Sequence, residues 1–250
     1  MIVYCVLAHN NPKHLHRLIT AINTPYSKIF LNLDTFYPTE FSELCLSKRI
    51  NNTKHTGWAN WSTIEATINL LQYGILQDVT HIVLLSGSDY PIVDIDYIND
   101  FFNTYKDINF MSCKKLPWPE GNKLEIRIPK DFDIVFPKWR PYCGYAYWAI
   151  TKDAAKYLLE QWNDRKRLFL QLQTIFPVEF YFQTVLFNSG KFNIDQHIMY
   201  YIHLNGKHGP ELLTKCQYEA AKQLPIHSDA YGIHECLFAR KFNDQSIFLD

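Results

Sequence analysis

The chain of 250 residues carries 25 basic and 25 acidic side chains, and 47% of its residues are apolar. This length and composition allow a full hydrophobic core and exclude intrinsically disordered, fibrous and low-complexity proteins. Because nucleic-acid-binding proteins usually carry a basic excess, the zero net charge argues against that class.

The first half of the chain alternates predicted strands and helices. Short apolar runs rich in β-branched residues predict strands at 2–8, 28–33, 81–85 and 110–112, with a further short strand within 47–51. Apolar residues at helical spacing predict helices between Pro12 and Pro25 and at 39–47, 61–77 and 95–105. This alternation predicts an α/β fold with a mostly parallel central sheet, helices on both faces, and ligands at the carboxyl ends of the strands.

The second half is less regular. Residues 113–140 mix lysines, prolines and short alternating runs such as 124–128, which indicates short strands or a flap over the sheet. A strand is predicted at 145–150, and helices are predicted at 152–162 and 178–188. Residues 206–250 are expected to be mostly irregular, with one helix at 214–223. We see no repeat and no linker, so residues 1–250 are expected to form a single domain.

The cysteines and the apolar runs bear on the compartment. The six cysteines are scattered and form no CxxC pair, which predicts free thiols in a reducing compartment. The apolar run at 2–8 is short and has no basic leader, so no targeting segment is expected. No run reaches the roughly 18–20 apolar residues that a membrane-spanning helix needs. These observations predict a cytoplasmic protein.

Three polar segments directly follow three predicted strands: 9–12, Asp34, and 86–91, which contains Asp89. Because the carboxyl ends of parallel strands meet at one edge of a sheet, these segments are expected to converge. A carboxylate there would accept hydrogen bonds from a ribose or a base. The alternative is that Asp34 and Asp89 cap turns or helices, and the residues alone leave both interpretations open.

Several common enzyme motifs are absent from the sequence. It contains no GxGxxG dinucleotide fingerprint, no P-loop, no HExxH zinc motif and no GxSxG nucleophile elbow. Their absence argues against NAD-dependent enzymes, P-loop kinases, zinc proteases and α/β-hydrolases.

Two charged segments stand out among apolar neighbours. Glu179 is a single acid within an aromatic segment at the predicted start of a helix, where burial would raise its pKa and suit a general base. The alternative is a carboxylate that simply interacts with the helix dipole. Arg240 and Lys241 lie between apolar residues, and cations held in this way suit a diphosphate, although exposed cations are usually only solvated.

Seven segments, in order, resemble the conserved blocks of one enzyme family. They are 6–12, 29–34, 57–62 with Leu70 and Leu71, 84–91, 144–151, 179–189 and 237–242. Together they extend over nearly the whole chain. The sequence thus resembles the core-2/I-branching β-1,6-N-acetylglucosaminyltransferase family (glycosyltransferase family 14), which also includes the peptide O-xylosyltransferases.

The resemblance implies a GT-A-like single domain that transfers a sugar from a UDP-sugar to a glycan hydroxyl. It implies inversion to a β-glycoside and no requirement for a divalent metal or another cofactor. Glu179 matches the general base of the family. Lys241 matches one member of a basic pair that takes the place of a metal at the diphosphate, and Lys207 or His208 is the nearest candidate for the other member. Because neighbouring residues of an extended segment point in opposite directions, Arg240 is then expected to form a structural ion pair.

The resemblance also assigns the remaining candidate residues. Residues 1–112 are expected to form the nucleotide-binding half and 113–250 the acceptor and catalytic half. The candidates for nucleotide contacts are Val6, His9 and Asp34, and those for contacts with the donor or acceptor sugar are Asp89, Trp148 and Trp58. GlcNAc is the first candidate for the transferred sugar, with xylose or another hexose as alternatives.

The chain departs from the family pattern in three ways. The N-terminal anchor, stem and disulfides of the animal members are not expected here. Val178 stands where the family commonly has an aspartate before the general base, which changes the local hydrogen bonding. The middle region is short, so the identity of the acceptor is not inherited. We expect the partners to be a UDP-sugar and a glycan, with no nucleic acid and no integral membrane segment; peripheral association with a lipid-linked acceptor stays open.

Two alternative functions remain at this stage. One is a metal-dependent GT-A transferase that uses a DxD string, either 94–96 or 131–133. The first string falls at the start of a predicted helix, where acids serve as caps, and the second lies in the irregular middle region. The other alternative is a non-catalytic, carbohydrate-binding relative whose aromatic residues form a platform for sugars.

Overall fold

The computed structural model describes residues 1–34, 48–49, 60–115, 127–174, 176–196, 198–204, 209–229 and 232–249. The helix predicted at 39–47 and most of the alternating run at 124–128 lie outside these residues.

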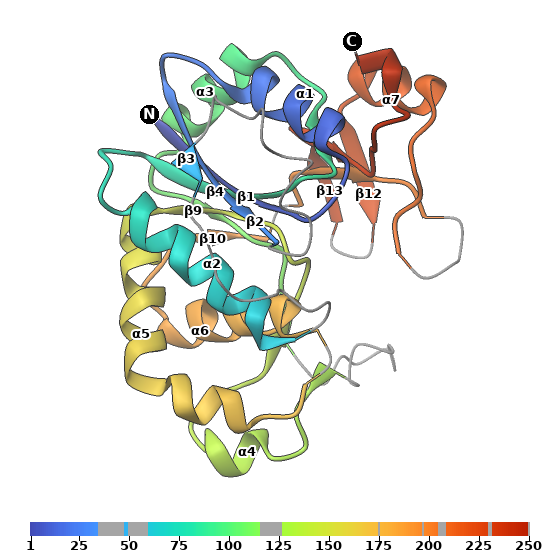
Figure 1. Ribbon diagram of the computed structural model, residues 1–250. Coiled ribbons are helices and arrows are strands. Elements are labelled where there is room, and N and C mark those ends of the chain that lie inside the picture. The colour runs from blue at the N-terminus through green and yellow to red at the C-terminus, as the bar shows by residue number, and fades with distance from the viewer. Residues whose placement is uncertain are drawn as a thin grey trace.

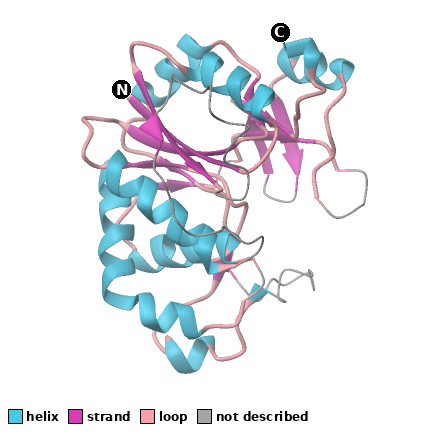
Figure 2. Cartoon of the chain, viewed as in Figure 1, coloured by secondary structure: helices cyan, strands magenta, loops and turns pink. Residues whose placement is uncertain are grey.

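A seven-stranded sheet forms the centre of the molecule (Figure 2). Its strands, in spatial order, are β10 (Ile194–Asp195), β6 (Asn109–Phe110), β9 (Ala149–Thr151), β4 (His81–Ser86), β1 (Ile2–Ala8), β2 (Ser27–Leu33) and β3 (Lys48–Arg49). Neighbouring strands are parallel except at β9, which is antiparallel to both β4 and β6. The prediction of a mostly parallel central sheet is therefore confirmed.

Helices cover both faces of this sheet (Figure 1). Helices α1 (Pro12–Ile22) and α3 (Ile95–Thr104) lie on one face, and α2 (Trp61–Gly74), α5 (Lys152–Gln171) and α6 (Tyr181–Ser189) lie on the other. The short helix α4 (Phe132–Val135) lies at the far end of α5, where Phe136 packs on Phe169 with ring centroids 4.7 Å apart. This arrangement agrees with the GT-A-like α/β domain that the sequence predicts.

The central strands are continuously apolar because both faces of the sheet are covered. Along β1, Val3 and Cys5 contact the cluster under α2, α5 and α6, whereas Ile2, Tyr4 and Val6 contact the cluster under α1 and α3. Successive side chains of a strand point to opposite faces, so each face receives every second residue. A strand with one solvated face would instead alternate apolar and polar residues.

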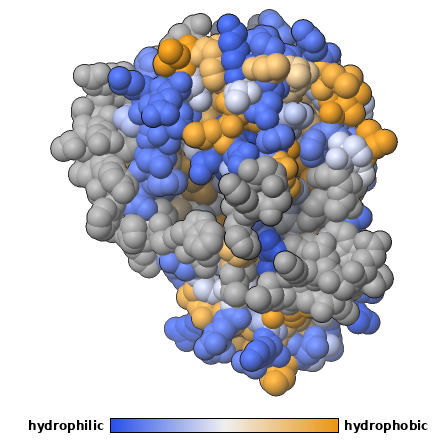
Figure 3. All heavy atoms as spheres, turned by 90° about the vertical axis from the view of Figure 1, so that its right-hand side faces the viewer, coloured by the Kyte–Doolittle hydropathy of each residue, from blue (hydrophilic) through white to orange (hydrophobic). Residues whose placement is uncertain are grey.

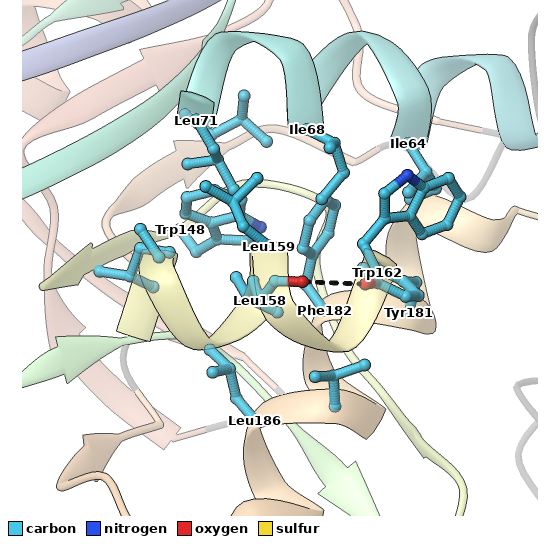
Figure 4. Packing of buried hydrophobic residues seen from close by; sticks show 14 of the residues in the cluster. Ile64, Ile68, Leu71, Trp148, Leu158, Leu159, Trp162, Tyr181, Phe182 and Leu186 are labelled. Atoms are coloured by element: carbon cyan, nitrogen blue, oxygen red, sulfur yellow. Dashed lines mark hydrogen bonds between the residues drawn. The ribbon is translucent and has the colours of Figure 1, made fainter. Parts of the chain in front are cut away.

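The larger core cluster lies between the sheet and the layer formed by α2, α5 and α6 (Figure 4). Its labelled members are Ile64, Ile68, Leu71, Trp148, Leu158, Leu159, Trp162, Tyr181, Phe182 and Leu186. The Tyr181 hydroxyl donates to the Leu158 carbonyl at 3.4 Å, so the one polar atom of this buried ring has a partner.

The last part of the chain is more regular than predicted. A second sheet combines β11 (Tyr200–Ile202), β14 (Phe238–Arg240) and β5 (Asp89–Pro91), and β12 (Ile226–Asp229) and β13 (Gly232–Glu235) form a hairpin. The expectation of a mostly irregular segment at 206–250 is therefore wrong, although the helix at 214–223 is confirmed by α7 (Lys215–Gln223). Strands of three or four residues are too short to show alternation, and β14 pairs with a strand from the first half of the chain.

Three predicted elements have different bounds in the structure. The helix predicted at 178–188 is a 3₁₀ turn (Pro177–Glu179) followed by α6, because Phe176 adopts a left-handed conformation (φ 63°) and Pro177 starts a new turn. Helix α5 continues well beyond residue 162 to Gln171, because residues 163–167 are all polar and give no apolar stripe before the buried Phe169. The strand predicted at 145–150 is replaced by β9 and by β8 (Tyr142–Cys143), which pairs with β7 (Lys114–Lys115).

The described cysteines are all free thiols, as the sequence predicts. Within the described part of the chain, no helix combines the length and the apolar character that crossing a bilayer would require.

Candidate functional site

The three polar segments that follow β1, β2 and β4 meet at one edge of the central sheet. These strands are adjacent and parallel. The N–H of Asp34 donates to the carbonyl of Ala8 at 2.9 Å, and the N–H of Gly87 donates to the carbonyl of Leu7 at 2.8 Å. The convergence predicted from the sequence is therefore confirmed.

Asp34 and Lys241 both lie close enough to His9 at this edge to change its pKa. Burial lowers the pKa of His9, the Asp34 carboxylate opposes that shift, and the Lys241 ammonium adds to it. Asp34 is itself buried (3% exposed), whereas Lys241 is exposed directly after β14. A neutral imidazole, a carboxylate and an ammonium from three distant segments thus share one neighbourhood.

Val6 is less available than the sequence suggested. Its side chain is fully buried in the cluster under α1 and α3, so it does not reach this edge. Every second side chain of β1 points toward α1 and α3, and Val6 belongs to this set together with Ile2 and Tyr4.

The segment that carries Lys241 is held by an ion pair across the second sheet. Arg240 is paired in register with Asp89, and its Nε lies 3.5 Å from Asp89 Oδ1. The other carboxylate oxygen of Asp89 accepts the N–H of Ser86 at 2.7 Å. The Tyr200 hydroxyl, which donates to the Leu84 carbonyl at 3.0 Å, also lies close enough to influence this carboxylate. The Arg240 guanidinium lies over the Tyr147 ring, 4.3 Å from its centroid. The structural ion pair expected of Arg240 is confirmed.

Asp89 does not occupy the position predicted for it. The residue is fully buried, so it is not exposed to a sugar. Burial raises its pKa to about 6, against the opposing effect of Arg240, the Ser86 N–H and the Tyr200 hydroxyl. The physical reason is that β5 pairs with β14, which places the carboxylate beneath the guanidinium rather than at the surface.

Glu179 ends the 3₁₀ turn that precedes α6. Its N–H donates to the carbonyl of Phe176 at 3.0 Å, and its carbonyl accepts the N–H of Gly144 at 2.9 Å, so the backbone is fixed on both sides. The side chain forms an ion pair with Arg127, with Nε 2.7 Å from Oε2 and 26% of the glutamate side chain exposed. Burial raises the pKa of Glu179, whereas Arg127 and, at longer range, Arg240 lower it.

Gly144 supports this turn through a close approach of two backbone segments. A Cβ on Gly144 would lie 1.8 Å from the carbonyl oxygen of Ser112, which no side chain tolerates. Ser112 in turn accepts the N–H of Tyr145 on its hydroxyl at 2.9 Å. The glycine lets the chain after β8 pack tightly against the backbone of Ser112, and in this position its N–H reaches the Glu179 carbonyl.

The structure does not support Trp148 as a contact with the sugar. It has no exposed surface, and its ring packs on Phe182 at 5.1 Å within the core (Figure 4). The helical layer under the sheet covers it completely, so it stabilises the fold instead of contacting a ligand. Trp58, Lys207 and His208 lie outside the described residues.

The two DxD strings occupy helix starts. Asp94 caps α3 by accepting the N–H of Asp96 at 2.8 Å, as the sequence suggested, and Asp131 and Asp133 lie at the start of α4. Within the described ranges, no three His, Cys, Asp or Glu side chains form a group that could hold a metal ion.

The sequence interpretation missed Arg127, Tyr147 and Tyr200. Arg127 lies in an alternating run, which gives no sign of its partner, because its contact with Glu179 depends on how the middle region folds back. Tyr147 and Tyr200 are two among many aromatic residues, and only the tertiary structure distinguishes them.

One surface depression is lined by a different set of residues. A cavity of about 300 Å³ on the β12–β13 hairpin is lined by Pro225, Ile226, Ile233, His234 and Glu235. Figure 3, which shows the molecule from the right-hand side of Figure 1, has hydrophobic residues scattered among polar ones on this face. None of the predicted site residues lines the cavity, so it is not part of the candidate site.

Comparison with known families agrees with this geometry. The sequence model of the core-2/I-branching enzyme family matches residues 2–223. The chain belongs to the core-2/I-branching enzyme family. It is a glycosyltransferase of the core-2/I-branching type, with a sugar donor and an acceptor as its substrates. The match ends before β14, so the roles of Arg240 and Lys241 depend on the structure and the resemblance. No curated protein matches the chain.

Proposed function

We propose that this core-2/I-branching enzyme transfers a sugar from a UDP-sugar to a glycan hydroxyl with inversion, without a divalent metal, and with Glu179 as general base. The observation that carries the proposal is the Glu179 carboxylate itself. It is partly exposed, its backbone is fixed by hydrogen bonds on both sides, and burial raises its pKa. A base of this kind has a pKa closer to neutral pH than an ordinary glutamate.

The proposed reaction is a single in-line displacement. The acceptor hydroxyl transfers its proton to Glu179 while its oxygen forms a bond to the anomeric carbon. The bond from that carbon to the diphosphate oxygen breaks at the same time, and UDP leaves with the electron pair. Attack from the face opposite to UDP converts an α-linked donor to a β-glycoside. A positioned general base contributes roughly 10²- to 10⁴-fold to such a step.

The leaving diphosphate gains negative charge as the bond breaks, and a fixed cation would stabilise it more strongly in the transition state than in the ground state. Lys241 is our candidate because its ammonium is exposed at the edge where His9 and Asp34 lie. Lys207 or His208 remains our candidate for the second cation. The Asp94 carboxylate already caps α3, which does not favour the metal-dependent alternative.

The uridine is proposed to lie against Asp34 and the turn after β1. A buried carboxylate at the carboxyl end of a strand suits a ribose hydroxyl or the N–H of uracil, both of which donate hydrogen bonds. GlcNAc is the first candidate for the donor sugar, with xylose or another hexose as alternatives. We propose that the enzyme acts in the cytoplasm on the glycan of a surface polysaccharide.

The decisive experiment replaces the base. Glu179→Gln should retain UDP binding, because the amide keeps the shape of the side chain, but lose about 100-fold or more in turnover, because the amide does not accept the proton. Release of UDP from a panel of UDP-sugars, with and without glycan acceptors, measures turnover. Glu160→Gln, on the exposed side of α5, is the matched control. Turnover of Glu179→Gln within a few-fold of the wild type would remove Glu179 from the mechanism.

A further inference from the structure

The ion pair between Arg127 and Glu179 uses only one oxygen of the carboxylate. The Arg127 Nε lies 2.7 Å from Oε2, and both side chains are mostly buried, with 20% and 26% of their surface exposed. The contact is therefore a close ion pair that water screens only partly. Since this contact engages Oε2, the second oxygen, Oε1, is left for another donor.

Arg127 is itself held by the segment that leads to Glu179. Its carbonyl accepts the hydroxyl of Thr174 at 2.7 Å, and its guanidinium lies 5.6 Å from the centroid of the Phe176 ring. Phe176 immediately precedes the 3₁₀ turn that ends at Glu179. Arg127 thus contacts the same short stretch of chain that carries Glu179. These contacts fix the relative orientation of the cation and the carboxylate before any substrate binds.

We propose that Arg127 is a positioning residue for the general base: its guanidinium holds Oε2 of Glu179 so that Oε1 faces the acceptor hydroxyl. This inference depends on the proposed role of Glu179 and adds a residue that acts through it. Arg127 needs no contact with either substrate to do so. A carboxylate that is free to rotate would spend part of its time with neither oxygen aimed at the proton, which lowers the rate of a step that requires alignment.

The ion pair also determines the pH at which the base works. Among the described residues, the charged or titratable groups that influence Glu179 are Arg127, Arg240 on β14 and the Cys143 thiol on β8. Burial raises the pKa of Cys143 to about 11, so this thiol is neutral near pH 7. Burial raises the pKa of Glu179, and the two arginines oppose it, Arg127 more strongly. Removal of Arg127 should therefore raise the pKa of Glu179 further, by about 1–3 units for the loss of an adjacent opposite charge.

The first test is the pH dependence of kcat/KM for Arg127→Met, Arg127→Lys and the wild type. A base must be deprotonated, so activity is lost as the pH falls through its pKa. We expect Arg127→Met to move this acidic limb upward by about 1–3 pH units. Arg127→Lys keeps the charge but not the planar guanidinium, so the limb should stay near that of the wild type while kcat falls. Arg140→Met is the matched control and should behave as the wild type, because Arg140 is an exposed arginine whose backbone N–H donates to Asn188 of α6.

The second test measures the carboxylate without any reaction. In protein labelled with ¹³C at the glutamate carboxyl carbon, the signal of Glu179 is the one that Glu179→Gln removes. Its titration should shift upward in Arg127→Met and not in Arg140→Met. An unchanged titration in Arg127→Met, or an acidic limb that does not move, would overturn the positioning role. Full turnover of Glu179→Gln would instead refute the proposed function, so the two failures are distinguishable.

Discussion

Removing the cation of the Asp89–Arg240 pair should destabilise the enzyme strongly. Arg240→Met keeps the apolar length of the side chain but leaves a fully buried carboxylate without its counter-charge. Loss of one partner of a buried ion pair typically costs about 3–5 kcal/mol in the free energy of unfolding. For a chain of this size, each kcal/mol corresponds to about 2–4 °C, so Tm should fall by roughly 6–20 °C.

The loss should depend on pH, because Asp89 can escape the penalty by binding a proton. Its pKa is about 6 in the native structure, where burial raises it and Arg240 opposes that rise. The folded chain therefore binds this proton more tightly than the unfolded chain does. The free energy of unfolding falls as the pH rises from the ordinary pKa of an aspartate, about 4, to the pKa of about 6 in the native structure. Without Arg240 the pKa rises further. Arg240→Met should thus lose more stability at pH 8, where the unpartnered carboxylate must stay charged or be protonated at a cost, than at pH 5.

Urea denaturation at pH 8 and pH 5 measures both effects. The double variant Asp89→Asn with Arg240→Met should recover much of the loss at pH 8, because it removes the buried charge together with its partner. Arg167→Met, at an exposed arginine of α5, is the control for loss of an arginine. A loss below about 1 kcal/mol for Arg240→Met at pH 8, or an equal loss at both pH values, would refute the reasoning.

Two further predictions concern the donor. Asp34→Ala should weaken binding of UDP by about tenfold or more in calorimetry, the scale of a lost hydrogen bond to a charged group, and unchanged affinity would return Asp34 to a structural role. Lys241→Ala should lower turnover by about 100-fold with little change in Tm, and added Mg²⁺ or Mn²⁺ should not restore it. EDTA should leave the wild type active; strong inhibition that Mn²⁺ reverses would favour the metal-dependent alternative.

The central sheet could be predicted because each of its longer strands is an uninterrupted apolar run. Such runs occur where helices cover both faces, and they end in polar residues where the chain reaches the sheet edge. The positions of His9 and Asp34 at a common edge followed from this pattern alone, since β1 and β2 are parallel and adjacent. The pattern did not predict which of the residues near the strand ends would be buried.

Trp148 shows why burial was harder to predict. A tryptophan in such an aromatic segment suits both a sugar platform and a core, and the choice depends on whether helices cover that face of the sheet. Here β9 lies inside the sheet between β4 and β6, and Phe182 of α6 packs on the indole. Arg127 is a similar case, because its short local pattern carries no information about a partner that lies far along the chain.

The ion pair that the sequence did suggest also explains how Lys241 reaches its position. Arg240 is opposite Asp89 in the ladder between β14 and β5, and a shift of one residue would place Lys241 opposite the buried carboxylate and Arg240 opposite Tyr90. The backbone after the strand is fixed as well. The N–H of Lys241 donates to the Glu211 carbonyl at 3.2 Å, and the N–H of Phe242 donates to the Ser88 carbonyl at 2.9 Å. Because a guanidinium satisfies a buried carboxylate better than a strongly hydrated ammonium does, the order Arg-Lys selects one register. In that register the cation that we propose for the diphosphate is the one left exposed.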